Sequence, residues 1–350
     1  MKKHLLPERE KYYKAAMHLH TTVSDGKATP EETKEAYRAL GYSIAAYTDH
    51  EVMVPHNELA DEDFLPLTAV ELARNSKECK EIGFSAAKTV HINLYSSDKN
   101  AVVYPGFCEE AVFCSSSREY VTDEMRKNQD ENSVYSTEYI NSVIKRANDA
   151  GFLVSLNHPV WSLQNYNEYI NYEGLFGVEV YNTAAARMGL VDTEQPLFDL
   201  LDRGERVYPM VGDDWHGGVN ECGKSSVWIG AEALEYDAVF AALRKGDFYS
   251  SSGPEIYELS IEDGILRIRC SEAVSIILST ERRRAKVKHA YDGEYITSAE
   301  FDISELIEQH RMVEARYKEL GFERKTYIRL TVKDKAGDKA YTRAYYLDEL

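Results

Sequence analysis

The sequence has few cysteines, few prolines and no long apolar run. Its five cysteines are scattered and include no CxxC pair, which argues against a disulfide framework and a zinc–thiolate site. With only 9 prolines and no low-complexity tract, extended disorder is not expected. No segment resembles a signal peptide or reaches the apolar length of a transmembrane helix, so we expect a cytoplasmic protein.

Positive charge is also scarce. The chain carries 41 Lys and Arg against 59 Asp and Glu, a net charge of −18. Residues 1–252 hold 24 basic and 40 acidic side chains, whereas residues 253–350 hold 17 and 19. An electrostatic field of this sign repels nucleic acids and anionic membranes, so neither is expected as a partner. An anionic substrate would need local positive charge, which bound divalent cations supply.

Strands alternate with helices over the first two thirds of the chain. A helix capped near Thr29 runs to Gly41, and a second helix, with Ile140 and Val143 on its apolar face, ends at Gly151. Strands are expected at the apolar runs, which are residues 15–21, 42–50, 65–73, 88–95, 151–159, 176–182 and 206–216. This alternation predicts parallel βα units, hence an α/β barrel or a doubly wound sheet.

Two segments break the alternation. Residues 96–136 are a Ser-, Cys- and charge-containing stretch too long for a simple connection, which we interpret as an insertion and a candidate lid. After the Ser- and Gly-containing segment 250–254, short alternating strands and one helical stretch follow, a pattern typical of a β-sandwich. We therefore expect a catalytic domain over residues 1–252 and a β-rich domain over residues 253–350.

The chemically reactive side chains gather at the ends of the expected strands. His18 and His20 point to the same side of a strand end, because side chains alternate with a period of two, so both can bind one cation. Glu71 follows an apolar strand, where an unpaired carboxylate would be costly. The other candidate ligands are Asp25, His50, His91, His158, Asp214 and His216. Active sites of α/β barrels lie at the carboxyl ends of the strands, so we expect these side chains to converge.

Taken singly, several of these residues have simpler explanations. A hydrogen-bonded imidazole at a strand end would account for His50, and a satisfied histidine within a sheet would account for His91. We interpret Asp213 as a partner of the ligands rather than a ligand. The four histidines outside the motifs lie in polar surroundings and are expected at the surface; they are His4, His56, His289 and His310.

Candidate substrate contacts are less specific than candidate ligands. His56 lies six residues after His50, in a loop that should approach the site. Arg187 and Lys224 are candidate contacts of a phosphate group, although most surface Arg and Lys side chains are only solvated.

The motifs HLH, SDG, TDH, a strand-terminal Glu, an isolated His, NHP and DWH follow one another across residues 18–216. In this order the sequence resembles the PHP (polymerase and histidinol phosphatase) superfamily of metal-dependent phosphoesterases. The resemblance implies a distorted (β/α)7 barrel with two or three divalent ions, followed here by a small β-sandwich-like domain. The FYSSSGP segment and the β-rich remainder resemble the carbaryl-hydrolase-like branch of that superfamily.

The resemblance also implies how the ligands are shared among the ions. The first ion would be held by His18, His20, Glu71 and Asp214. Glu71 would bridge to a second ion held by His91 and His158. The third ion would be held by Asp25, His50 and His216.

The predicted activity is hydrolysis of a small phosphorylated molecule by metal-activated water. Ions that share Glu71, with Asp214, would activate the water and stabilise charge on phosphoryl oxygens, while His50 is a candidate to assist the leaving oxygen. Imidazole and carboxylate ligands suit zinc, manganese or iron. Two alternatives stay open: hydrolysis of a carbamate, ester or amide at the same site, and a non-catalytic, metal-stabilised binding protein.

Overall fold

The computed structural model describes residues 2–190, 193–218, 221–322 and 324–350. Among the described helices, none is long and apolar enough to cross a membrane. The Thr29 hydroxyl accepts from the Glu32 amide and the Glu32 carboxylate accepts from the Thr29 amide, so a capping box starts α1. The described α-helices are α1 Pro30–Arg38, α2 Cys79–Ile82, α3 Asp123–Lys127, α4 Thr137–Asp149, α5 Tyr166–Tyr169, α6 Thr183–Arg187, α7 Gln195–Arg203, α8 Tyr236–Lys245 and α9 Ser304–Glu319.

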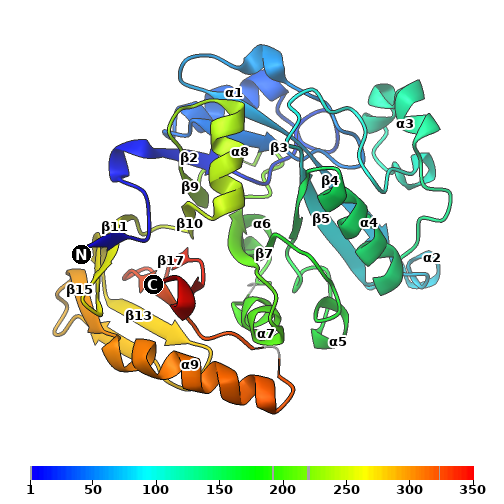
Figure 1. The fold of residues 1–350 in the computed structure, drawn as a ribbon. Helices are drawn as coiled ribbons and strands as arrows, with labels where there is room; N and C mark the ends of the chain where they lie inside the picture. The colour runs from blue at the N-terminus through cyan, green and yellow to red at the C-terminus, as the bar shows by residue number, and fades with distance from the viewer. Residues whose placement is uncertain (1, 191–192, 219–220, 323) are drawn as a thin grey trace.

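One 14-stranded sheet runs through the molecule (Figure 1). Its order is β14-β13-β16-β17-β10-β9-β2-β3-β4-β5-β6-β7-β8, and β18 pairs with β16. The strands before residue 252 are β2 Tyr12–Ala16, β3 Ile44–Tyr47, β4 Leu65–Asn75, β5 Thr89–Tyr95, β6 Leu153–Leu156, β7 Gly177–Asn182, β8 Tyr208–Gly212, β9 Ser226–Gly230 and β10 Phe248–Ser251. Strands β3 to β8 fall at the expected apolar runs. Strand β2 begins three residues before the expected segment 15–21 and ends at Ala16, so His18 and His20 follow the strand instead of ending it. Strand β9 and helix α8 lie where no element is expected from the sequence.

The strand directions differ from an uninterrupted parallel barrel. The pairs β2/β3, β3/β4, β6/β7 and β7/β8 are parallel, but β5 is antiparallel to both β4 and β6. Parallel neighbours are usually joined through a crossover helix. Only the four-residue helix α2 separates β4 from β5, so the chain turns back. The expectation of repeated parallel βα units is therefore wrong at β5.

The expected closure of the barrel is also not found among the described strands. The Ser250 hydroxyl of β10 donates to the Pro209 carbonyl of β8 at 2.7 Å, so the two regions approach each other. No ladder of backbone hydrogen bonds joins β8 to β9 or β10 in the described part of the chain, and the sheet stays open. The fold is a mixed α/β arrangement around a large open sheet.

The C-terminal part contains a second sheet. This 4-stranded sheet has the order β1-β11-β12-β15, in which the N-terminal β1 pairs with β11. The strands involved here are β1 Lys3–His4, β11 Ile256–Glu262, β12 Ile265–Ala273, β13 Ser275–Thr280, β14 Lys286–His289, β15 Ile296–Asp302, β16 Tyr327–Lys333, β17 Lys339–Thr342 and β18 Tyr345–Tyr346. Both sheets share a core that includes Leu259, Ile268, Ile276 and Leu330. Because β10 pairs with β17, the large sheet crosses the predicted domain boundary.

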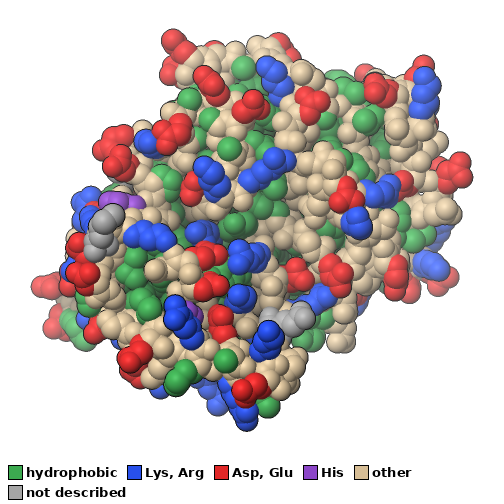
Figure 2. Space-filling model, viewed as in Figure 1, with side chains coloured by type: hydrophobic (Ala, Val, Ile, Leu, Met, Phe, Trp, Pro, Cys, Tyr) green, Lys and Arg blue, Asp and Glu red, His purple; other side chains and the backbone are tan. Residues whose placement is uncertain are grey.

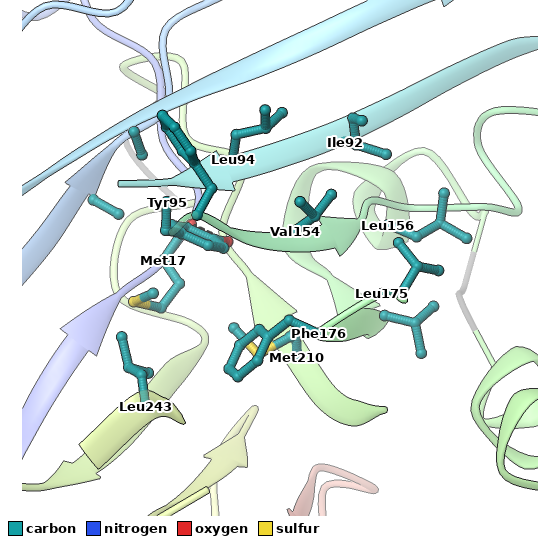
Figure 3. Close-up of a cluster of buried hydrophobic side chains, with 14 of the residues drawn as sticks. Met17, Ile92, Leu94, Tyr95, Val154, Leu156, Leu175, Phe176, Met210 and Leu243 are labelled. Carbon is teal, nitrogen blue, oxygen red and sulfur yellow. Dashed lines mark hydrogen bonds between the residues drawn. The ribbon is translucent and has the colours of Figure 1, made fainter. Parts of the chain in front are cut away.

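A separate apolar core packs the strands that lead to the candidate ligands (Figure 3). Met17, Ile92, Leu94 and Val154 are almost completely buried in it. Each such side chain contributes about 1.5–3 kcal/mol through removal from water. The Tyr95 hydroxyl donates to the Met17 carbonyl at 2.9 Å, which fixes the end of β2 against β5. The backbone immediately before His18 is therefore rigidly positioned.

The segment 96–136 lies against the same strand ends. It contains α3 and the 3-10 helices η3 Glu109–Ala111 and η4 Ser117–Tyr120. The Ser117 hydroxyl contacts the carbonyls of Val23 at 3.1 Å and His50 at 3.2 Å. Arg74 of β4 donates to the Gly106 carbonyl and pairs with buried Glu51 at 2.9 Å. These contacts hold the segment beside the candidate ligands, and its role as an inserted lid stays a prediction.

Candidate metal centre

The HLH and DWH motifs lie side by side at the ends of β2 and β8. The His20 amide donates to the Trp215 carbonyl at 2.8 Å, and the Asp214 amide donates to the His18 carbonyl at 3.0 Å. Asp214 has a φ of +52°, which is uncommon for a residue other than glycine and is associated with functional sites. The local backbone therefore turns the side chains of both motifs toward the same space.

His91 reaches this space because β5 is reversed. In the β4/β5 register, His91 faces Ala73 and Asn93 faces Glu71. His91 thus lies near the start of β5, which is the edge of the sheet at which β4 ends. His158 approaches from the end of β6, where its own φ is +25°. The antiparallel strand, unforeseen in the sequence, still brings its histidine to the predicted location.

Glu71 is the centre of the cluster and is 1% exposed. Imidazole nitrogens surround both of its oxygens. Within 3.1–3.3 Å lie His18 Nε2, His91 Nδ1 and His158 Nε2 at Oε1, and His20 Nε2 and His50 Nδ1 at Oε2. The Asn157 amide donates to Oε1 at 2.7 Å and fixes its orientation. A carboxylate with different ligands at each oxygen is arranged to bridge two cations.

Two aspartates extend the cluster beyond Glu71. Asp214 Oδ1 lies 3.4 Å from His18 Nε2 and 3.1 Å from His20 Nε2. Asp25 Oδ2 lies 3.8 Å from His50 Nε2 and 3.5 Å from His216 Nε2. The Asp25 and His216 side chains are 38% and 34% exposed, so solvent reaches the cluster from their side.

The structure brings all nine predicted ligands into groups whose ligand atoms lie within 4.8 Å of one another. The groups are His18–His20–Glu71–Asp214, His20–Asp25–His50–His216, His50–Glu71–His91 and His18–His158–Glu179. The first group is the set predicted for the first ion. The second group is the set predicted for the third ion, with His20 added. The set predicted for the second ion is divided, because His91 groups with His50 while His158 groups with His18. Metal binding by these residues stays a prediction.

The residues present fit divalent transition-metal ions. Two donor atoms bound at about 2.1 Å to one tetrahedral ion lie roughly 3.4 Å apart, close to the separations around Glu71 and Asp214. Among the nine candidate ligands, four imidazole nitrogens are buried without a hydrogen-bond partner: His18 Nε2, His20 Nε2, His50 Nδ1 and His91 Nε2. An unsatisfied buried polar atom costs about 1–3 kcal/mol, and a cation would bind each of these lone pairs.

Glu179 of β7 is a buried carboxylate that was not predicted for the site. Its Oε1 lies 2.7 Å from His18 Nδ1, and its Oε2 accepts from the His158 amide at 2.9 Å and from the Asn182 side chain at 3.1 Å. A carboxylate at one ring nitrogen directs the other nitrogen of the imidazole toward a metal. An isolated Glu in an apolar strand is the same signal that identified Glu71, so the sequence contained the information.

Two further aspartates, one within the TDH motif and one before the DWH motif, accept hydrogen bonds from loops. Asp49 accepts from the backbone amides and hydroxyls of Thr21 and Ser24 at 2.7–3.1 Å. Asp213 accepts from the Gly223, Lys224 and Ser225 amides and from three hydroxyls. Within the described residues, no hydrogen bond or ion pair links Asp213 to the nine ligands, so the expectation that it supports them directly is not met.

The mixture of carboxylates and imidazoles perturbs the pKa values. Burial acts to raise the pKa of Glu71, but the surrounding imidazoles bring it well below its ordinary value. Burial acts to lower the pKa of His20, whereas the adjacent carboxylates of Asp214 and Glu71 raise it to about 10. For His50 the effect of burial dominates and lowers the pKa to about 3. Protons therefore compete with cations at His20, while His50 is already neutral.

The predicted substrate contacts lie outside this set of interactions. Arg187 Nε lies 3.5 Å from a Glu221 carboxylate oxygen, and Lys224 is exposed. His56 is buried with its ring centroid 4.7 Å from that of Tyr47, so its expected surface position is wrong. Within the described residues, no hydrogen bond or ion pair links any of the three predicted contacts to the nine ligands.

The other histidines outside the motifs differ in their exposure to solvent. His4 and His289 are exposed as expected. His310 is 8% exposed, so its expected surface position is also wrong. It lies on α9, where the polar neighbours in the sequence are on other faces of the helix.

Aromatic side chains stand beside the candidate ligands. The Trp161 ring centroid lies 4.9 Å from that of His158 and 5.4 Å from that of His91. Phe113, in the segment 96–136, lies 4.9 Å from the His50 ring and is 55% exposed. These contacts were not foreseen because they depend on the path of loops between the strands.

No protein-family model and no curated protein matches the sequence. Solved structures do resemble the fold. A two-domain protein from Bacteroides vulgatus, containing a predicted PHP-like metal-dependent phosphoesterase, is 14% identical, with a TM-score of 0.44 over 98% of this chain and 91% of that chain.

Two further structures match a shorter part. An amidohydrolase from Chromobacterium violaceum is 17% identical, with a TM-score of 0.41, and a protein assigned as a metal-dependent phosphoesterase from Bifidobacterium adolescentis is 18% identical, with a TM-score of 0.36. The match with each structure covers 60% of this chain and 89% of the matched chain. None of the three is described as a carbaryl hydrolase, and that branch stays a prediction.

Proposed function

We propose that this protein is a metal-dependent phosphoesterase that hydrolyses a small phosphorylated molecule at the cluster around Glu71. The observation that carries this proposal is the shared position of Glu71, whose two oxygens face different imidazoles at 3.1–3.3 Å. Neighbouring ions that share a carboxylate suit phosphoryl transfer, because they can stabilise both the attacking and the leaving oxygen. Zinc, manganese or iron suits the imidazole and carboxylate ligands.

Divalent ions bound here would activate a water molecule and neutralise charge on the phosphoryl group. The side chains of the protein position that chemistry. Glu179 accepts the Nδ1 proton of His18 and leaves its Nε2 free as a ligand, and Asn157 orients Glu71. The lowered pKa of His50, caused by burial, favours its role as a neutral ligand over the alternative role as a proton donor to the leaving oxygen.

Substrate would enter on the side of the partly exposed Asp25 and His216. Phe113 and Trp161 flank the ligands, and with substrate bound their rings would limit the access of water and so strengthen electrostatic interactions in the cluster. The candidate substrate contacts remain Arg187, Lys224 and His56. At Arg187, the phosphate group would have to compete with the Glu221 carboxylate.

A substrate panel tests this proposal. Protein loaded with manganese or zinc would be assayed on 4-nitrophenyl phosphate, bis(4-nitrophenyl) phosphate, 4-nitrophenyl acetate and an aryl carbamate. We expect hydrolysis of a phosphate ester that is lost on chelation and in the Asp214→Asn variant. Hydrolysis of the carbamate or acetate without any phosphate ester would support the carbonyl-hydrolase alternative. Full metal loading with no hydrolysis of any compound would support the non-catalytic binding protein.

A further inference from the structure

A second polar site lies at the opposite end of β8. A cavity of about 200 Å³ opens between the start of β8, the last turn of α8 and the C-terminal segment. Its basic lining residues are Arg206, Arg244, Lys245 and Arg343. On the face drawn in Figure 2, Lys and Arg side chains lie along the area between α8 and the C-terminus, with acidic side chains among them.

This cavity is separate from the metal centre. Tyr208, which lines the cavity, is the first residue of β8, whereas Asp214 follows the last residue of that strand. A strand rises about 3.3 Å per residue, so the two positions are roughly 20 Å apart. An anion in this cavity therefore does not contact the candidate metal ligands.

Positive charge exceeds negative charge at the cavity. Its lining includes four cationic side chains and a single carboxylate, that of Glu349. Glu349 lies 3.4 Å from Arg206 and 3.6 Å from Arg343, and Asp247 lies near Lys245 and Arg343 outside the lining. In a chain with a net charge of −18, this local excess is opposite in sign to the whole molecule. Repulsion among these cations is relieved when an anion binds between them.

The guanidinium groups are held in place by aromatic rings. Arg343 lies 4.3 Å from the Tyr345 ring centroid, Arg206 lies 4.7 Å from that of Tyr346, and Arg244 lies 5.1 Å from that of Phe240. Arg244 donates one N–H to the Gly151 carbonyl and Arg343 donates one to the Ala344 carbonyl, both at 2.9 Å. Stacking against a ring leaves the remaining N–H groups at the guanidinium edge available for an anion. Arg343 Nε is buried without a hydrogen-bond partner. Side chains that are already ordered lose little conformational freedom on binding.

Gly246 keeps the wall of this cavity open. It follows α8 with a φ of +73°, and a Cβ there would lie 2.5 Å from the Tyr208 ring and 2.8 Å from Arg343 Cδ. A side chain at this position would therefore displace two residues of the lining.

We propose that this cavity binds a small phosphate-type dianion, at a site distinct from the metal centre. Arginines that converge from separate chain segments match the several oxygens of phosphate better than those of a monovalent anion. The volume is below the range of pockets for drug-sized ligands, so a phosphate group or a small phosphorylated compound fits its size. This site is independent of the proposed hydrolytic activity.

Calorimetric titration of the metal-loaded protein with inorganic phosphate tests the proposal. The test variant is R244Q/K245Q, in which both substitutions lie in the last turn of α8. The matched control is R316Q/K318Q, which removes the same charge from the last turn of α9. A second variant, R206Q, changes a side chain that is 65% exposed and therefore tolerant of substitution.

We expect one phosphate-binding event to weaken at least tenfold in R244Q/K245Q and in R206Q, and to be unchanged in R316Q/K318Q. Sulfate should compete for this event, because it is a dianion of the same shape, and chloride at the same ionic strength should not. Equal phosphate binding by the wild type and by folded R244Q/K245Q and R206Q proteins would overturn the proposal. An equal loss in the R316Q/K318Q control would also overturn it, since the effect would then follow net charge alone.

Discussion

Replacing Glu179 by Gln should weaken metal binding although Glu179 lies behind the ligands. Its Oε1 accepts the His18 Nδ1 proton, and its Oε2 accepts from the His158 amide and the Asn182 side chain. Gln has the same shape but offers one oxygen and one NH2 group. If the NH2 faces His18, the imidazole must carry its proton on Nε2, which then cannot bind a cation. If the NH2 faces His158, it meets the N–H donor of the His158 backbone amide, and two buried donors then face each other without an acceptor.

The magnitude follows from these two choices. Loss of a hydrogen-bonded carboxylate behind a metal-bound histidine typically lowers metal affinity about 10–100-fold. That range corresponds to about 1.4–2.7 kcal/mol. Two buried donors that face each other cost a similar free energy, about 1–3 kcal/mol, so both orientations of the Gln side chain are destabilising.

Competition with a chromophoric chelator measures this effect directly. Zinc or manganese affinity would be compared among the wild type, E179Q and E138Q, where Glu138 is an exposed residue of α4. We expect E138Q to bind like the wild type and E179Q to bind at least tenfold more weakly, with circular dichroism confirming that both fold. A folded E179Q protein with the metal affinity of the wild type would refute the role assigned to Glu179.

Three further perturbations have definite expected outcomes. Asp213→Asn should lower the free energy of unfolding by about 1–3 kcal/mol in urea titrations, because an Asn NH2 would face the donors that Asp213 now accepts from. Arg74→Met should lower the free energy of unfolding by about 3–5 kcal/mol in the same assay, because it leaves the Glu51 carboxylate buried without its cationic partner. Metal affinity should fall from pH 8 to pH 6, with proton release seen by calorimetry in different buffers, since the pKa of His20 is raised to about 10 without metal.

Much of the candidate site was predictable from the sequence because strand ends bring distant residues together. His18, Glu71 and Asp214 are far apart in the chain, but they follow or lie in β2, β4 and β8, which are strands of one sheet. Glu179 was missed although its apolar strand gives the same signal as the strand around Glu71. Asp213 was interpreted as a partner of the ligands, and only its hydrogen-bond donors reveal that it holds a loop instead.

Less of the fold was predictable. The pattern around His91 identifies a strand but carries no information about its direction, which depends on the connection to β4. Closure of the sheet depends on how β8 meets β9, and β9 was not recognised at all. The continuity of the large sheet across residues 252 and 253 follows from the pairing of β10 with β17, whose sequences are remote from each other.

Elemental analysis of the purified, metal-loaded protein measures whether Glu71 is shared between cations. After dialysis against metal-free buffer, we predict that the wild type retains at least two zinc, manganese or iron ions per chain, and that folded Glu71→Gln protein retains fewer. A wild-type chain that retains no transition metal, or a Glu71→Gln variant with the full wild-type content, would show that Glu71 does not bridge cations.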